Sequence, residues 1–388
     1  MRSQIVIKRC ESYDPETVYS VLKDAVDALG GIKKFVRSDE KILIKPNLLR
    51  GRAPENACTT HPAVFEAMIR ILKEAGCAQL IYGDSPGVGQ PEKVSEESGL
   101  KAVADQYQIP LGEFSRGSTV EYPEGKITKS FELAQSVIEA DAMISLCKMK
   151  THGLTRITGA VKNQLGCVYG FNKGTSHARF PDAFQFSKML VDLNQMLKPR
   201  LYVMDGIKAM EGNGPASGTP TAMNCLIVSS DPIAVDTAFA QMVGLDPNFV
   251  PTIVAGKEMG LGNSDPDKIE WLGDESADFL NLDFKVERIP AKNEGPTKTM
   301  GFLYRLKYFK GLLTRKPVVI PERCVGCGVC VESCPLEKKA IRLKRTQGKK
   351  IPIYDYHRCI RCYCCQEMCP KKAIKVKTPL LGKLFIYH

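Results

Sequence analysis

The stretch PERCVGCGVCVESCP, residues 321–335, and the stretch YHRCIRCYCCQEMCP, residues 356–370, decide the fold of the C-terminal part of this chain. Both space their cysteines as CxxCxxCxxxCP. Three thiolates in a tight loop can bind one face of an iron–sulfur cubane, while the fourth, followed by proline, reaches the cluster of the other repeat. The spacing therefore predicts two [4Fe-4S] clusters, held by Cys324, Cys327, Cys330 and Cys369 and by Cys359, Cys362, Cys365 and Cys334.

Zinc is the main alternative for paired cysteines, but structural zinc sites use four ligands in separated pairs rather than two interlocked runs of four. The spacing resembles that of the bacterial two-cluster ferredoxins, and the resemblance includes the Ala-Ile pairs at 340–341 and 373–374. It implies a protein that transfers electrons. Cys364 lies outside the repeated frame and is read as a non-ligating thiol beside the cluster, with a redox role or alternative ligation left open.

The remaining cysteines are expected to stay reduced as free thiols. Six of the fifteen are scattered singly as Cys10, Cys58, Cys77, Cys147, Cys167 and Cys225 and are read as small core residues. The first ten residues lack the apolar run of a signal peptide, and no stretch approaches the roughly 18 apolar residues of a membrane span. We therefore expect a cytoplasmic protein whose thiols bind metal instead of forming disulfides.

The net charge of +11 belongs to the C-terminal part of the chain. Residues 1–297 hold 33 basic and 38 acidic residues, residues 298–317 hold six basic and no acidic ones, and residues 318–388 hold 15 against five. Such a surface favours an acidic redox partner such as a ferredoxin, flavodoxin or oxidoreductase, or an anionic membrane. Alternatively, the charge offsets that of the ligated clusters. Nucleic acid is not expected, because no aromatic platform interleaves the basic residues.

The order of apolar runs in residues 4–290 predicts an α/β domain. Strands are expected at 5–7, 41–45, 78–82, 142–146, 201–205 and 225–229. Helices are expected from Pro15 to the glycines at 30 and 31, over 62–75, and near 132–140, 183–198, 232–243 and 249–259. This alternation is typical of strands and helices built around a mostly parallel sheet.

The predicted architecture is therefore a large, mostly parallel-sheet α/β domain over 1–290 and a small α+β ferredoxin-like 2[4Fe-4S] domain over 318–388. Residues 291–317 are expected to form a basic amphipathic linker. Its helix either packs on a neighbouring domain, which we favour, or lies on an anionic membrane surface.

Polar side chains follow four of the expected strands, and in a parallel sheet the carboxyl ends of strands form ligand sites. These residues are Lys45, Asn47, Asp84, Ser85, Lys148, Lys150, His152 and Asp205, joined by Lys162, Asn163 and Glu211 from two later segments. The three lysines and the histidine at the strand ends indicate an anionic ligand. The same residues could equally be caps and turns. No GxGxxG follows a strand and no GxxxxGK[ST] occurs, so dinucleotide or ATP binding by those loops is not expected.

Asp236, five residues after Asp231-Pro232, is read as an acidic residue near a helix N-terminus rather than as a catalytic group.

The order KPN, GDSPG, KMKTH, TGAVKNQLG, DGIKAMEGNGPASGTP and DPIAVD resembles the domain of unknown function (DUF) 362 family, which is often fused to a ferredoxin module. The resemblance covers roughly residues 5–290. It implies an iron–sulfur fusion protein of anaerobic metabolism, with no assigned reaction.

We expect a ferredoxin-wired oxidoreductase in which the clusters deliver electrons to an anionic substrate or cofactor of the N-terminal domain. His152 and Lys148 are the expected catalytic residues, with His152 as proton donor, because reductions consume protons. Lys45, Asn47, Asp84, Ser85, Lys150, Lys162, Asn163 and Glu211 are expected to bind the substrate. The sequence identifies no organic cofactor. The alternative is a non-catalytic relay that docks a redox partner.

Overall fold

The computed structural model describes residues 2–170, 172–180, 182–291, 315–346 and 348–379. The chain forms two compact units, one of Met1–Gly170 with Ser187–Ala291 and one of Phe171–Phe186 with Lys292–His388. Residues 171–186, which the sequence placed in the large domain, thus group with the C-terminal part. The expected linker helix lies almost entirely outside the described residues. None of the helices that the structure describes has the length and apolarity needed to cross a bilayer.

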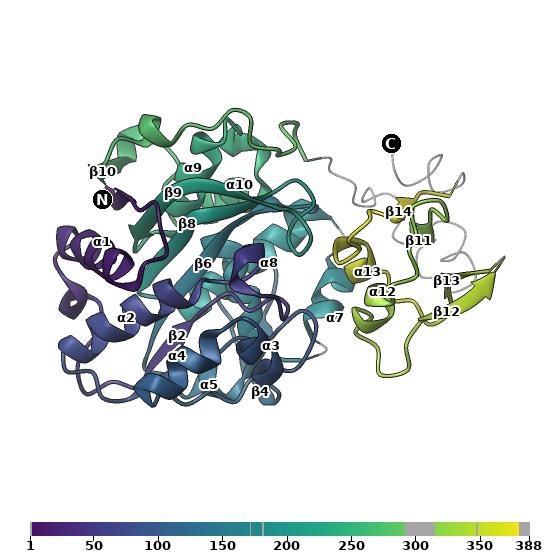
Figure 1. The fold of residues 1–388 in the computed structure, drawn as a ribbon, viewed down its shortest axis with the longest axis horizontal. Helices are drawn as coiled ribbons and strands as arrows, with labels where there is room; N and C mark the ends of the chain where they lie inside the picture. The colour runs from purple at the N-terminus through teal and green to yellow at the C-terminus, as the bar shows by residue number, and fades with distance from the viewer. Residues whose placement is uncertain (1, 171, 181, 292–314, 347, 380–388) are drawn as a thin grey trace. The chain divides into compact units, whose positions relative to one another are not determined.

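The first unit is built on one mixed, mostly parallel sheet (Figure 1). Its strands are β1 (Ser3–Arg9), β2 (Ile42–Lys45), β3 (Leu80–Tyr82), β6 (Ala142–His152), β7 (Arg156–Thr158), β8 (Leu201–Glu211), β9 (Thr219–Ser229) and β10 (Ile269–Gly273). They lie in the order β10-β1-β9-β8-β6-β2-β3, with β7 paired to β6. The pairs β10–β1, β8–β6, β6–β2 and β2–β3 are parallel, which confirms the predicted fold class.

Strand β9 is antiparallel to both of its neighbours, β8 and β1. The reason is the connection from β8, which spans only residues 212–218. A parallel return needs a crossover of a dozen or more residues, so a link this short gives an antiparallel pair.

Strands β6 and β8 are longer than predicted. Residues 147–152 and 206–211, expected as polar segments beyond the strands, continue them to 11 residues each. Their side chains are almost all buried, so the charged positions among them lie within the sheet rather than on loops.

Helices and small hairpins complete the first unit. The helices are α1 (Pro15–Ala28), α2 (Pro62–Glu74), α3 (Pro91–Glu97), α4 (Leu100–Tyr107), α5 (Gln135–Ile138), α6 (Ala160–Asn163), α9 (Pro232–Met242) and α10 (Pro251–Met259). Helix α8 (Ala183–Leu197) begins in the second unit. The helix expected near 132–140 begins only at Gln135, because Ser130–Ala134 forms β5, paired with β4 (Gly117–Glu121).

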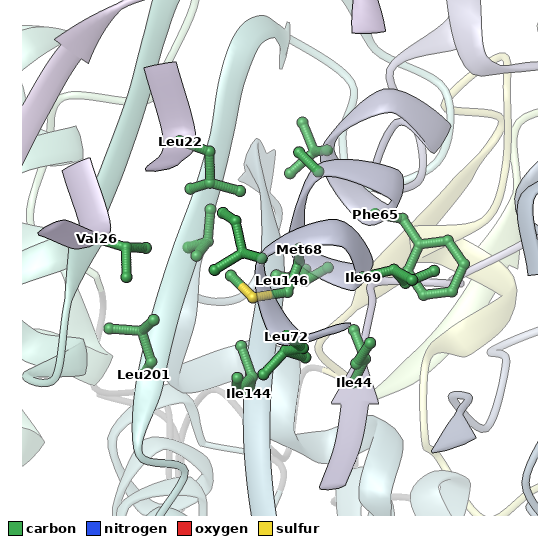
Figure 2. Close-up of a cluster of buried hydrophobic side chains, with 14 of the residues drawn as sticks. Leu22, Val26, Ile44, Phe65, Met68, Ile69, Leu72, Ile144, Leu146 and Leu201 are labelled. Carbon is green, nitrogen blue, oxygen red and sulfur yellow. The ribbon is translucent and has the colours of Figure 1, made fainter. Parts of the chain in front are cut away.

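The core on one face of the sheet joins α1 and α2 to the central strands (Figure 2). Leu22 and Val26 of α1 and Phe65, Met68 and Leu72 of α2 share this buried cluster with the strand residues Ile44, Ile144, Leu146 and Leu201. Full burial of each such side chain stabilises the fold by about 1.5–3 kcal/mol. The packing of α1 and α2 on the sheet holds the N-termini of both helices near the carboxyl ends of the strands.

The second unit contains two small antiparallel pairs, β11 (Lys316–Val319) with β14 (Ile374–Lys377) and β12 (Ile341–Thr346) with β13 (Lys349–Tyr354). Helical turns α12 (Val329–Glu332) and α13 (Cys364–Glu367) follow the cysteine loops, and α7 (Asn172–Arg179) precedes α8. The two Ala-Ile pairs predicted from the repeats are buried among the cysteines.

Candidate functional site

The cysteines of the second unit surround two separate hollows. Cys324, Cys327, Cys330 and Cys369 line one of them, and Cys334, Cys359, Cys362 and Cys365 line the other. These are the two interlocked quartets that the spacing predicts. Four thiols around one hollow match the number of thiolates that a cubane takes, one for each iron. Among the residues that the structure describes, no three ligand side chains converge as they would on a single ion.

Two positions in each cysteine loop adopt left-handed backbone conformations. In the first loop they are Gly326 and Gly328, with φ of 68° and 82°, and in the second they are Arg361 and Tyr363, with φ of 65° and 59°. A side chain in this region costs roughly 1–2 kcal/mol. The second loop offsets that cost through contacts, because the Arg361 guanidinium lies 5.0 Å from the centre of the Tyr356 ring and the Tyr363 hydroxyl donates to the Arg315 carbonyl at 3.0 Å.

Two hydrogen bonds to the cysteine sulfurs come from residues outside the cysteine runs. The Tyr354 hydroxyl donates to Cys365 Sγ at 3.5 Å, and the Ala373 N–H donates to Cys369 Sγ at 3.2 Å. Such bonds stabilise the more negative, reduced state of an iron–sulfur centre. Cys364 lies beside Cys362, with its Sγ 3.9 Å from the Cys362 carbonyl oxygen, and it lines neither hollow.

In the first unit, the predicted polar residues gather where β2, β3, β6 and β8 end or approach their ends. Lys45 is completely buried, and its Nζ lies 3.2 Å from Asp84 Oδ1 and 3.0 Å from Asn163 Oδ1. A Cβ on Gly166 would overlap Asp84 and approach Lys45 Nζ to 2.8 Å, so only glycine lets this loop cover the ion pair. The structure thus brings together residues from three predicted motifs.

Asn47 connects this ion pair to the second buried lysine. Its Nδ2 donates to Asn163 Oδ1 at 3.1 Å, and its Oδ1 accepts from Lys150 Nζ at 2.7 Å. The other acceptor for Lys150 Nζ is the Cys58 carbonyl at 2.7 Å. Lys150 therefore has two neutral oxygen partners, and no described carboxylate lies within ion-pair distance of it. Burial lowers the pKa of Lys150 to about 8.

Lys148 belongs to a separate buried cluster with Asp205, Tyr13 and His61. Lys148 Nζ lies 2.7 Å from Asp205 Oδ2, and the Tyr13 hydroxyl donates to Asp205 Oδ1 at 2.8 Å. The Tyr13 and His61 rings stack with centroids 3.5 Å apart. Burial lowers the pKa of Lys148 and raises that of Tyr13. The charge of Lys148 is balanced by Asp205.

Sequence reasoning missed Tyr13 and His61. His61 is the N-cap of α2, where its Nδ1 accepts from the Ala63 N–H at 3.2 Å, and burial lowers its pKa to about 4. Tyr13 precedes the N-cap of α1. The available signal was their place at helix N-termini that follow strands β1 and β2 in a parallel sheet.

The other predicted residues make hydrogen bonds or electrostatic contacts of their own. His152 ends β6, and its Nδ1 accepts from the Leu154 and Thr155 N–H groups at 3.1 and 3.3 Å. Glu211 ends β8 and accepts from the Lys285 N–H at 2.9 Å. Ser85 Oγ accepts from the Gly170 N–H at 3.2 Å. Lys162 is half-buried on α6, and its charge contributes to lowering the pKa of Lys150.

Asp236 is fully buried, and its carboxylate accepts from the Ala160 and Val161 N–H groups at 2.6 and 3.3 Å. It therefore caps α6, while Asp231 caps its own helix α9. Burial raises the pKa of Asp236 to about 7.

Residues 42–241 match the family described as "Domain of unknown function (DUF362)", and residues 323–373 match the "4Fe-4S dicluster domain". The chain is 34% identical over 262 residues to the thylakoid-associated protein sll1697 of Synechocystis sp., covering 67% of this chain and 81% of that protein.

Two solved structures are similar in part. The lactate racemase apoprotein from Thermoanaerobacterium thermosaccharolyticum has a TM-score of 0.42 at 10% identity, covering 61% of this chain and 56% of that one. A Thermotoga maritima protein has a TM-score of 0.36 at 12% identity, covering 58% and 57%. The chain spans little more than half the length of either structure.

Proposed function

Because this chain belongs to the DUF362 family and ends in a 4Fe-4S dicluster domain of the ferredoxin type, we propose that it is an iron–sulfur oxidoreductase. The ferredoxin-type domain makes it an iron–sulfur electron-transfer protein. The proposal adds that two [4Fe-4S] clusters deliver electrons to an anionic ligand bound beside Lys150.

The observation that carries the anionic ligand is the charge balance of the three buried lysines. Lys45 and Lys148 each have a carboxylate partner, Asp84 and Asp205, whereas Lys150 has only the neutral oxygens of Asn47 and Cys58. A buried ammonium without a counter-charge is costly. A carboxylate or phosphate ligand at this position would supply the missing charge.

The chain's residues have distinct roles in this proposal. Cysteine thiolates of the two quartets hold the clusters, which supply single electrons when bound. Lys150 binds the anion, and Asn47 orients the Lys150 ammonium. His152 is the proton donor, because an Nδ1 that accepts backbone N–H bonds leaves the ring proton on Nε2. Lys148 acts through Asp205 and positions the N-termini of α1 and α2.

The test of the proposal begins with anaerobic purification, analysis for iron and sulfide, and mass spectrometry of any extracted small molecule. We expect about eight irons per chain. A panel of phosphate, oxalate and nucleotides is then scored by thermal stabilisation of the native protein, Lys150→Gln and the charge-retaining Lys150→Arg. Stabilisation that Lys150→Gln loses and Lys150→Arg keeps supports the anion site, whereas equal stabilisation of all three contradicts it.

A relay without catalysis is the second candidate, and it is favoured by the internal pairing of Lys45 and Lys148. His152→Gln separates the two functions. In an oxidoreductase this variant keeps its iron but no longer transfers electrons to the identified ligand, whereas a relay still reduces its partner at the native rate.

We propose a cytoplasmic location. The alternative is a membrane surface, which is favoured by the thylakoid-associated relative and by the basic residues 298–317. Co-sedimentation with phosphatidylglycerol vesicles at low and high salt distinguishes them, because binding that persists at high salt requires apolar insertion as well as charge.

A further inference from the structure

The two cysteine loops share a backbone path but present unlike surfaces. At the two left-handed positions the first loop has Gly326 and Gly328, while the second has Arg361 and Tyr363, whose side chains fold over the module. Gly326 lets the Lys350 backbone come close, because a Cβ added at Gly326 would lie 2.7 Å from the Lys350 carbonyl oxygen. The first loop therefore carries no covering side chains at these two positions, and the β12–β13 hairpin lies beside it.

Side chains of the first loop are also more exposed to solvent than the equivalent side chains of the second loop. Cys327 is exposed and Val325 is 62% exposed, whereas the equivalent residues of the second loop, Cys362 and Ile360, are buried and half-buried. An exposed apolar side chain surrounded by charge is typical of the centre of a protein–protein contact. A ligand thiol at the surface also lets a redox centre outside the protein come close to the first quartet.

Positive charge gathers beside the first loop. A Cβ on Gly326 would lie 3.1 Å from the Lys350 Cβ, and Leu343 and Pro352 line the same hollow as the first quartet, so the β12–β13 hairpin adjoins this loop. Residues 341–353 contain no acidic residue. Their five basic side chains, all exposed, are Arg342, Lys344, Arg345, Lys349 and Lys350.

We propose that the loop 325–328 and the β12–β13 hairpin form a docking port for an acidic redox protein that carries a low-potential flavin or iron–sulfur centre. This inference rests on the proposed electron-transfer function and adds the place at which electrons arrive. Each step moves one electron from the reduced partner to the site held by the first quartet, and no bond forms or breaks. The basic hairpin steers the acidic partner, and Val325 packs at the centre of the contact.

An anionic membrane would also be attracted by the hairpin, but a lipid surface carries no electron and would not use the exposed Cys327. An acidic redox protein would complement the basic charge of the hairpin and could bring its redox centre close to the exposed Cys327 of the first quartet.

The experiment uses the complete, cluster-loaded protein under anaerobic conditions, with reduced acidic [2Fe-2S] ferredoxin as the probe in stopped flow. Lys350→Glu should slow reduction about tenfold at low ionic strength, and the difference should shrink as salt rises. Arg358→Glu is the matched control, since it makes the same charge change beside Cys359 of the second loop. It should leave the rate nearly unchanged, as should either variant when dithionite is the reductant.

Three results would contradict the proposed docking port. One is equal slowing by both variants, and another is no slowing by Lys350→Glu. The third is a native protein that dithionite reduces but the ferredoxin does not. In each case a normal iron content leaves the proposed electron-transfer function standing, whereas a chain without iron removes that function itself. The assignment of a protein partner would also be contradicted if phosphatidylglycerol vesicles bound through Lys350 while reduction by ferredoxin did not depend on this residue.

Discussion

Replacement of Lys150 by methionine should change how the stability of the first unit depends on pH. In the folded protein, burial lowers the pKa of Lys150 to about 8, against 10.5 for an exposed lysine. Between these two values the unfolded chain binds more protons than the folded one, so the free energy of unfolding rises with pH. A difference of about 2.5 pKa units corresponds to roughly 3 kcal/mol, gained between pH 8 and 10.5 and absent below pH 8.

Lys150→Met removes this titration. Other lysines, tyrosines and cysteines also titrate above pH 8, so the informative quantity is the difference in unfolding free energy between the native protein and the variant at each pH. That difference should shift by roughly 3 kcal/mol in favour of the native protein from pH 7.5 to 10.5. Lys150→Arg is the control, because arginine stays charged throughout and should show no comparable shift relative to Lys150→Met.

Urea unfolding followed by tryptophan fluorescence measures the unfolding free energy of the first structural unit. The chain has one tryptophan, Trp271, which is half-buried in β10 of the first unit. A difference curve that stays flat within about 0.5 kcal/mol across this pH range would refute the reasoning, since it would mean that the Lys150 ammonium is already balanced by charge in the folded protein.

Three further predictions concern other parts of the molecule. Lys148→Met should destabilise the first unit by about 3–5 kcal/mol, because it leaves Asp205 buried without its counter-charge, and adding Asp205→Asn should recover part of that loss in urea unfolding. His61→Gln should flatten the loss of stability between pH 6.5 and 4, where the native imidazole stays neutral while the unfolded one takes a proton; an unchanged acid limb in thermal melts would contradict this. Cys365→Ser should lower the iron content and alter the spectrum of one cluster, whereas Cys364→Ser should retain about eight irons, and loss of iron in the second variant would assign Cys364 as a ligand.

The sequence predicted the second unit in most of its detail because its cysteines lie close together in the sequence. Six of the eight cysteines fall within two stretches of seven residues, and the tight turns between them leave few arrangements of the thiols. The crossing of Cys334 and Cys369 to the opposite quartet follows from the repeat itself, and the structure places each among the cysteines predicted for it.

The class of the first unit was also determined by the sequence, since its alternating runs predict the central strands and the helices α1 and α2. The periodicity could not distinguish a strand end from a strand that continues with polar residues, so β6 and β8 were predicted too short. The apolar pattern ends at the first charged residue, whereas the backbone hydrogen bonds between neighbouring strands continue past it.

The pairing of the buried charges was decided only by tertiary structure. The sequence showed three lysines of equal standing, and nothing local distinguished Lys150 from Lys45 and Lys148. Asp84 and Asp205 approach two of these lysines from other strands, and His61 reaches the site from the N-terminus of α2. Which lysine lacks a counter-charge depends on contacts between residues 39 or more positions apart, and these contacts exist only once the sheet has assembled.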